Sequence, residues 1–453
     1  MNIRMIKPSR WLGLALAVCV PAYVWAAPGP EVALDVVSID QEQAVVELAG
    51  HGMENVGGFE FELVLSGQAA RVRGAQLEVD FLGQAGRTAQ PLGPYMDADG
   101  TSLAAGGYSY GSPASGADGN QALAQITLTL DQAGLSRLSL EEMTLVAPDA
   151  TILLSTTQEH ALQVSDLVIG WNLLSACIDP GSQPLSATLQ GIAGQYDQVV
   201  AQDNSAPAGL DAGAAYWLRS TAGASSRLGM LGAPYAPTTT LALEPGWHWI
   251  GYCLEESQPV TAAMASMTGK YDRVVGDAGA YAPALSPLYQ SLWAMDFGQG
   301  YLVHVTEAGT LQYPQMTESS QAQPSNTCQT PVAPTPYSSL LYGTVRVDGE
   351  LAPAGSVVEV LTPRHEVAGC FRLGTSGLYG LANVYGADSD GAIAGFRDGE
   401  PLALRVNGCV PVTSSLSWAD DKTPHELHVS VVDGVCHLEI LEHVYLPLVL
   451  KTL

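Results

Sequence analysis

One segment in the middle of the chain occurs twice, and any fold must give both copies the same structure. GWNLLSAC at 170–177 recurs as GWHWIGYC at 246–253, and YDQVV at 196–200 recurs as YDRVV at 271–275. Between these matches, apolar residues in both copies follow the spacing i, i+4 and i+7, which is typical of an amphipathic helix. Ordered matches of this kind indicate a duplication, so we predict two small α+β units, each with a strand, a helix, a strand, a loop and a strand. The tandem repeat is expected over 166–313, as units 166–240 and 241–313.

The repeat resembles the GWNL-S…YD…GYW repeats at the ends of secreted bacterial surface proteins, and this resemblance implies a non-catalytic module. Cys177 and Cys253 hold the same place in both copies. We therefore predict that they form a disulfide across a pseudo-twofold axis. Four matched aromatic residues are expected to form the shared core of the two units, with a ligand groove as the alternative. They are Trp171, Tyr216, Trp247 and Tyr301.

The segment 27–165 carries the alternation of a β-sandwich. In GGFEFELVLSG at 57–67, the phenylalanines and leucines point to one side and the glutamates point to the other. Period two with one polar face is typical of a strand that packs on one side only. Further alternating runs follow, separated by Gly, Asp and Asn turns, and no helix-period segment of useful length lies among them. The segment is therefore predicted to be all-β.

Two motifs in this segment resemble those of cohesin domains. They are NVGGFEF at 55–61 and GNQALAQITL at 119–128. Cohesins fold as jelly-roll sandwiches and dock dockerin modules, and structural relatives of cohesins bind polysaccharide. The resemblance implies a cohesin-like β-sandwich at 27–165, with an extracellular protein module or a polysaccharide as its partner.

GYSYG at 107–111 matches the G-x-S-x-G pattern that presents a nucleophilic serine in many esterases. That elbow needs a helix directly after the serine, but the following SPASGADGN is rich in turn-forming residues. We therefore expect that Ser109 is not a nucleophile. Tyr108 and Tyr110 are two residues apart on one strand and so share a face. They are expected to pack in the core or at an edge, with a platform for sugar rings as the alternative.

The first 26 residues have the features of a secretory signal peptide: basic residues, an apolar run and a small-residue cleavage site after Ala26. No later apolar run is long enough for a membrane span, so we expect an extracellular or cell-surface protein.

The formal net charge of −27 at pH 7 argues against nucleic acid as a partner. The remaining cysteines are even in number, which predicts a disulfide framework in an oxidising compartment. They are Cys177, Cys253, Cys328, Cys370, Cys409 and Cys436.

Residues 314–338 are rich in Pro, Ser, Thr and Gln and are predicted to form an extended linker. After it, GTVRVDG at 343–349 and GSVVEV at 355–360 resemble the immunoglobulin-like or transthyretin-like modules of extracellular bacterial proteins, which serve as spacers or adhesin stalks. The resemblance and the alternating valines predict a β-sandwich with a C-terminal tail over 339–453. Its cysteines are expected to pair as Cys370–Cys409 and Cys328–Cys436.

Three short motifs suggest metal sites, and each lacks a required element. HELH at 425–428 has histidines three apart in a strand pattern, whereas zinc proteases need them four apart on a helix. DADG at 97–100 and DSDG at 388–391 look like the start of calcium loops, but neither has a glutamate at the twelfth position. Asx turns explain the aspartates, with bound calcium as the alternative, and no other cofactor or metal is predicted. The aspartates concerned are Asp97, Asp99, Asp388 and Asp390.

The sequence thus predicts a mainly β protein with a cohesin-like jelly-roll sandwich, two small α+β repeat units and an Ig-like or transthyretin-like β-sandwich. No nucleophile–base pair, carboxylate pair or ligand cluster stands out, so an enzyme is not expected. The predicted function is that of a secreted, non-catalytic scaffold or adhesion protein that docks a protein through its cohesin-like sandwich. The alternative is carbohydrate binding by Tyr108 and Tyr110 or by aromatic residues of the repeats.

Overall fold

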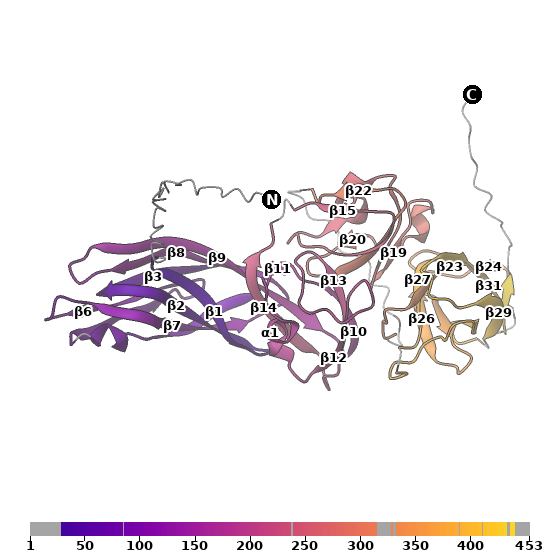
Figure 1. Cartoon of the computed structure of the whole chain (residues 1–453). Helices are drawn as coiled ribbons and strands as arrows, with labels where there is room; N and C mark the ends of the chain where they lie inside the picture. Colours follow the sequence, from indigo (N-terminus) through magenta and orange to yellow (C-terminus); the bar gives the residue numbers. More distant parts are fainter. Residues whose placement is uncertain are drawn as a thin grey trace, which may run out of the picture.

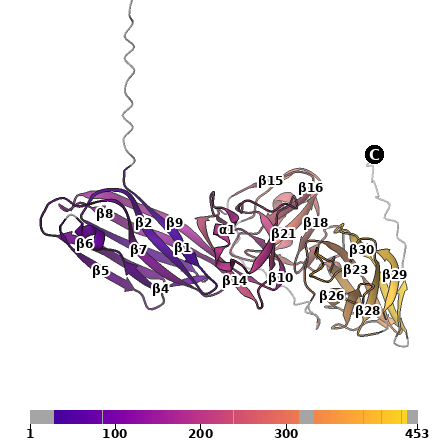
Figure 2. The ribbon, with the colours of Figure 1, turned by 60° about the horizontal axis from the view of Figure 1, so that its bottom comes forward.

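The structure is a computed structural model in which three parts follow one another along an elongated molecule (Figures 1 and 2). A β-sandwich lies at one end, the repeats lie in the middle and a second β-rich module lies at the other end. No helix among the described residues is long and apolar enough to cross a membrane. The predicted signal peptide lies outside the described residues. The structure describes residues 29–84, 86–236, 239–314, 328, 332–388, 390–409, 411–432 and 435–439.

Two antiparallel sheets form the first part. The smaller sheet has the order β1-β2-β7-β4, from Glu31–Ile39, Gln43–Val56, Ala117–Leu130 and Ala70–Leu77. The larger sheet contains β9-β8-β3-β6-β5, from Ile152–Leu167, Gly134–Val146, Gly58–Gly67, Ser102–Tyr110 and Thr88–Met96. The alternation predicted for β3 is confirmed, since Phe59, Phe61 and Leu63 are buried in the core between the sheets while Glu60 is exposed. The predicted fold class, mainly β with sandwich-like sheets, is confirmed.

The two middle units have the same order of elements. Each has a three-strand core whose last strand lies in the centre, β10-β13-β12 in the first unit and β16-β21-β18 in the second, with β19 at the edge. A register shift falls after Tyr196 in β12 and after Tyr271 in β18, at matched positions. The bounds are Gly170–Ser175 (β10), Tyr196–Val200 (β12), Ala215–Ser220 (β13), Gly246–Gly251 (β16), Tyr271–Gly276 (β18), Gly279–Tyr281 (β19) and Gly300–Val305 (β21).

The predicted helices are shorter than their apolar spacing suggested. Among the described residues, only α1 (Leu185–Thr188) and α2 (Val260–Ala263) are α-helical, and each continues as a single 3₁₀ turn. A glycine with positive φ follows each turn, Gly194 at +75° and Gly269 at +79°, and this left-handed conformation ends the helix. Of the four matched aromatic residues, Trp171, Tyr216 and Tyr301 are buried as core, whereas Trp247 is half-buried.

The sandwich and the first repeat unit share one sheet. Strand β14 (Ser226–Pro234) pairs with β9 from Ser226↔Leu167 to Gly232↔Ala161, and β11 (Ile178–Asp179) pairs with β14. The larger sheet therefore has seven strands in the order β11-β14-β9-β8-β3-β6-β5. Leu135, Ala161 and Leu167 of the sandwich also belong to the hydrophobic core of the first unit. The backbone ladder and this core join the two parts.

The remaining short strands complete the second unit and the last module. In the second unit, β15 (Leu241–Leu243) pairs with β22 (Gly309–Leu311), and β17 (Gln258–Pro259) pairs with β20 (Ala294–Met295). In the last module the strands follow the order β29-β28-β25-β26-β27-β23-β31-β32, and β24 and β30 also pair with β23. They are Ser338–Val347 (β23), Glu350–Leu351 (β24), Val357–Leu361 (β25), Val367–Arg372 (β26), Leu378–Tyr385 (β27), Pro401–Val406 (β28), Val412–Ser417 (β29), Pro424–Glu426 (β30), His428–Val432 (β31) and Val435–Glu439 (β32).

The disulfides confirm one predicted pair and correct the others. Cys177 and Cys253 are bonded, with Cα atoms 5.1 Å apart, as the matched positions predicted. Cys370 is bonded to Cys328, so the predicted pairs Cys370–Cys409 and Cys328–Cys436 are wrong. The reason lies in the strand order. Strand β25 separates β26, which carries Cys370, from β28, which leads to Cys409. Two strand spacings amount to about 9–10 Å, beyond the usual reach of a disulfide.

Cys409 is itself disulfide-bonded. The side chain of Cys436 lies outside the described residues. Most of the predicted linker, from residue 315 to 327 and from 329 to 331, also lies outside them, as does the C-terminal tail from residue 440 onward.

Candidate functional site

Tyr108 and Tyr110 lie on the outer face of the larger sheet rather than in the core. They are 42% and 51% exposed, whereas Leu103 and Ala105, on the other face of β6, are buried. The two rings have centroids 6.2 Å apart and an interplanar angle of 35°. The sequence predicted correctly that the tyrosines share a face, but it favoured packing in the core or at an edge, whereas the side chains lie outside the core and are about half exposed.

Two further apolar side chains lie on the same face. Strand β5 pairs with β6 so that Leu92 lies opposite Gly106 and Tyr95 lies opposite Ala104. Residues opposite one another in an antiparallel pair share a face, so these side chains join the tyrosines of β6. Leu92 is 44% exposed and Tyr95 is 68% exposed. We call Leu92, Tyr95, Tyr108 and Tyr110 the aromatic face.

Acidic residues border the aromatic face along the next two strands. In β3, Glu60 lies opposite Gly106 and Glu62 lies opposite Ala104, and Glu142 of β8 lies opposite Glu62. None of these three carboxylates forms an ion pair with a described residue. The outer surface thus changes from apolar on β5 and β6 to negative on β3 and β8.

The small residues between the tyrosines and the glutamates are required by backbone packing. A Cβ at Gly106 would lie 2.4 Å from the carbonyl oxygen of Phe59 on the neighbouring strand. The surface at Gly106 therefore carries no side chain, and the tyrosine rings project from the sheet beside it. The edge strand β5 contains Pro91 and Pro94, which lack an N–H group and so discourage pairing with a further strand. A further strand is thus disfavoured at this edge of the sheet.

Ser109 lies between the two tyrosines in sequence but points to the opposite side. It is 8% exposed, its hydroxyl donates a hydrogen bond to the Gly57 carbonyl at 3.0 Å, and it accepts one from Arg87 Nε at 3.0 Å. Arg87 also donates to the carbonyls of Gly111 and Pro113. The hydroxyl thus contacts a carbonyl and a guanidinium, neither of which can act as its general base. These contacts hold the turn after β6 in place.

Asp97 forms the turn between β5 and β6. Its carboxylate accepts hydrogen bonds from Thr101 N at 2.7 Å, Thr101 Oγ1 at 2.5 Å and Ser102 N at 3.0 Å. The bond from the Thr101 hydroxyl, with help from these backbone amides, holds the pKa of Asp97 below its usual value. Asp99 is exposed on the same turn. Within the part of the chain that the structure describes, no group of three His, Cys, Asp or Glu side chains could hold a metal ion.

Asp388 and Asp390 bind an arginine of the first repeat unit. Arg219 of β13 contacts both carboxylates at 2.7 Å and contacts Asp197 of β12 at 2.6 Å. The Asp388 side chain is 0% exposed and that of Arg219 is 7% exposed. The guanidinium also lies over the Trp171 ring, 5.6 Å from its centroid. The bond to Arg219 holds the pKa of Asp390 far below its usual value.

The Arg219 cluster is part of a larger contact between the last module and the repeats. Ser291 Oγ donates to the Leu381 carbonyl at 2.7 Å, and Asn383 Nδ2 donates to the Gly276 carbonyl at 2.9 Å. One hydrophobic cluster contains side chains from both repeat units and from the module. No pattern in the sequence indicates this contact, because its members are far apart along the chain. The module members of the cluster are Leu340, Tyr342 and Leu381.

No protein-family model and no curated protein matches the chain. Part of the chain resembles solved cohesin domains. The sixth cohesin of scaffoldin B from Acetivibrio cellulolyticus, solved in complex with a mutant Cel5 dockerin, is 11% identical; the match covers 29% of this chain and 97% of that chain, with a TM-score of 0.23. A non-cellulosomal cohesin from Archaeoglobus fulgidus is 12% identical over 29% of this chain and 91% of that chain, with a TM-score of 0.22. The cohesin module of a family 33 glycoside hydrolase from Clostridium perfringens is 13% identical over 29% and 93%, also at 0.22.

Proposed function

We propose that this chain is a secreted, non-catalytic scaffold or adhesion protein whose sandwich binds another protein through the aromatic face. The observation that carries this proposal is the grouping of Leu92, Tyr95, Tyr108 and Tyr110, all exposed, on two adjacent strands. Isolated exposed apolar residues are normal on protein surfaces, but adjacent ones mark interaction sites. Tyrosine is also enriched among the residues that contribute most to binding energy in protein interfaces.

The acidic border indicates the chemistry of the partner. Glu60, Glu62 and Glu142 have no described cationic partner, so they are available to Lys or Arg side chains of a bound protein. Complementary charges around an apolar centre speed association and select against unsuitable partners. The proposed partner therefore presents an apolar side chain to the tyrosines and basic side chains to β3 and β8.

Rigid attachment of the sandwich suits a scaffold. The β9–β14 ladder joins the sandwich to the first repeat unit, and the Arg219 cluster joins that unit to the last module. A disulfide, Cys177–Cys253, links the two repeat units, and a second, Cys328–Cys370, ties the segment before the last module to β26. Disulfides of this kind persist in oxidising compartments, which supports secretion.

Polysaccharide binding at the same face is the second candidate. It is favoured by the exposure of both rings on one strand. Against it, the rings of Tyr108 and Tyr110 are tilted by 35° and so do not form one flat platform for a flat sugar chain. The unpaired glutamates add little to the binding of a neutral glycan, whereas they favour a basic protein.

The experiment compares three forms of the whole chain: the wild type, Tyr108→Ala/Tyr110→Ala and Glu60→Gln/Glu62→Gln. Each is tested for retention on insoluble and soluble polysaccharides and for capture of proteins from the culture fluid, with a melting curve as the control for folding. We expect that both double variants bind a captured protein more weakly than the wild type does. The effect of the glutamine variant should be largest at low salt. Retention on a glycan that only the alanine form loses would support the polysaccharide alternative instead.

A further inference from the structure

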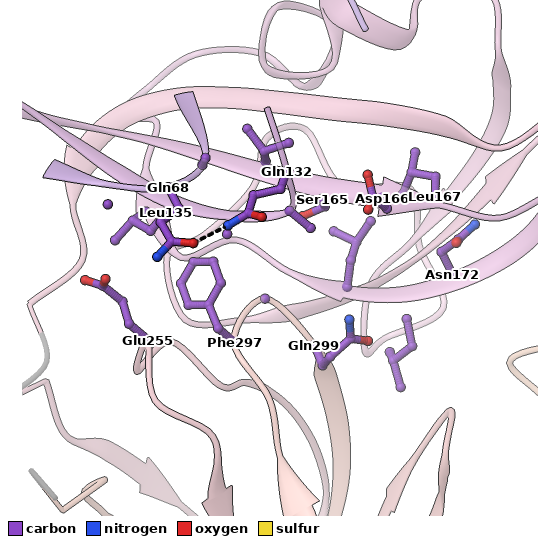
Figure 3. A pocket seen from close by; sticks show the side chains of 18 of the residues that line it. Gln68, Gln132, Leu135, Ser165, Asp166, Leu167, Asn172, Glu255, Phe297 and Gln299 are labelled. Carbon is purple, nitrogen blue, oxygen red and sulfur yellow. Dashed lines mark hydrogen bonds between the residues drawn. The ribbon is translucent and has the colours of Figure 1, made fainter. Parts of the chain in front are cut away.

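A cleft of about 620 Å³ lies between the sandwich and the two repeat units, since residues 172–174 of β10 also line it. Its upper wall comes from the β3–β4 turn at Gln68, the β7–β8 turn at Gln132 and the strand β9, and its lower wall comes from Glu255 and the loop 297–299 (Figure 3). The volume falls within the range of small-molecule sites, which often lie between domains. This cleft is far from the aromatic face in the order of the sheet, since it borders β9 rather than β5.

Amide side chains supply the directional groups of the cleft. Gln132 Nε2 donates a hydrogen bond to Gln68 Oε1 at 2.7 Å. This bond uses the Gln68 carbonyl oxygen and one N–H of Gln132, so the Gln68 NH₂ group and the Gln132 carbonyl oxygen remain for a ligand. Gln299 stands on the opposite wall (Figure 3). Paired donors and acceptors of this kind suit hydroxyl groups, each of which both donates and accepts a hydrogen bond.

The carboxylates that line the cleft are largely neutralised. Asp166 pairs with Arg227 at 2.9 Å, and Glu255 lies 3.6 Å from Arg137. Asp277 is open to the cleft on one side, but the surrounding protein removes much of its hydration and raises its pKa to about 7. The cleft thus offers neither a free cation for an acidic ligand nor a strong negative charge for a basic one.

An aromatic ring completes the lining. Phe297 is half-buried, and its ring points toward the Gln68–Gln132 pair (Figure 3). A half-buried ring beside these amides offers an apolar surface and hydrogen-bonding groups within one small space. A ligand with alternating C–H and O–H groups can use both at once.

We propose that this cleft binds a short neutral saccharide, with one sugar ring against Phe297 and its hydroxyl groups bonded to Gln68, Gln132 and Gln299. The saccharide site is separate from the aromatic face and does not depend on the proposed protein partner. The chain would then hold a protein partner on the outer face of the sandwich and a glycan beside the repeats.

The test is isothermal titration of the whole chain with cellobiose, maltose and N,N′-diacetylchitobiose, and with glucosamine and glucuronate as charged probes. We expect saturable binding of at least one neutral disaccharide in preference to both charged sugars. Gln132→Leu should weaken that binding about tenfold, which corresponds to about 1.4 kcal/mol and to the loss of one good hydrogen bond. Phe297→Leu should weaken the binding of the disaccharide more than Gln132→Leu does.

The control is Gln43→Leu, the same change at an exposed glutamine that does not line the cleft, which should leave saccharide binding unchanged. Gln132 is exposed, so its substitution does not threaten folding even if Phe297→Leu proves unstable. The proposal is overturned if none of the three neutral disaccharides binds, if only a charged sugar binds, or if Gln132→Leu binds the disaccharide as well as the wild type does.

Discussion

The contact between Arg219 and Asp388 should be the most sensitive single point in the attachment of the last module. The substitution Arg219→Met keeps much of the side-chain volume but removes the charge. Asp388, which is 0% exposed, would then be left without its counter-charge. Removing one partner of a buried ion pair costs about 3–5 kcal/mol, so we expect destabilisation of that order.

The assay is differential scanning calorimetry of the whole chain, which separates the transition of the last module from the others if they unfold independently. The matched control is Arg227→Met, because the Asp166 partner of Arg227 is 60% exposed and surface pairs contribute only about 0–1 kcal/mol. The double change Arg219→Met/Asp388→Asn should recover part of the loss, because no buried charge then remains. A cost for Arg219→Met no larger than for Arg227→Met, or strict additivity in the double variant, would refute the reasoning.

Three further predictions concern the hydroxyl of Ser109, the carboxyl of Asp277 and one disulfide. Ser109→Ala removes the hydroxyl that bonds to the Gly57 carbonyl, so the free energy of unfolding of the sandwich should fall by about 1 kcal/mol. A fluorophosphonate probe should not label the native wild type. Labelling of Ser109 would contradict this. Because burial raises the pKa of Asp277 from 3.8 to about 7, the stability that the protonated carboxyl contributes is present below the unfolded pKa and is lost as the pH rises through about 7. Asp277→Asn should therefore flatten the fall in melting temperature between about pH 4 and about pH 7, and an equal fall in both forms would count against the raised pKa of Asp277. A non-reducing peptide map should link Cys328 to Cys370.

Features set by short-range sequence patterns were predicted well. The period-two alternation of β3 depends only on which neighbours face the core, so it identified the buried Phe59 and Phe61 and the exposed Glu60. Matched positions in the two repeat copies indicated the Cys177–Cys253 disulfide, because equivalent residues of two symmetry-related units can meet at the axis between them.

Features that depend on distant contacts were missed. The aspartates of DSDG look like a turn or a calcium loop when only their neighbours are considered, but Asp388 binds Arg219, 169 residues away. The pairing of β14 with β9 and the Cys328–Cys370 disulfide depend in the same way on strand order, which local patterns do not contain. The exposure of Tyr108 and Tyr110 also could not be predicted, since alternation tells which residues share a face but not which face is covered.

The central claim, that the aromatic face is the contact surface for a protein partner, is tested most directly by hydrogen–deuterium exchange on the whole chain. The captured partner is added at saturation, and the exchange of each backbone segment is compared with that of the free protein. We predict protection of β5 and β6, with smaller changes in β3 and β8, and none in the β7–β8 turn that borders the cleft. Protection confined to the repeats or to the last module, with β5 and β6 unchanged, would contradict the account.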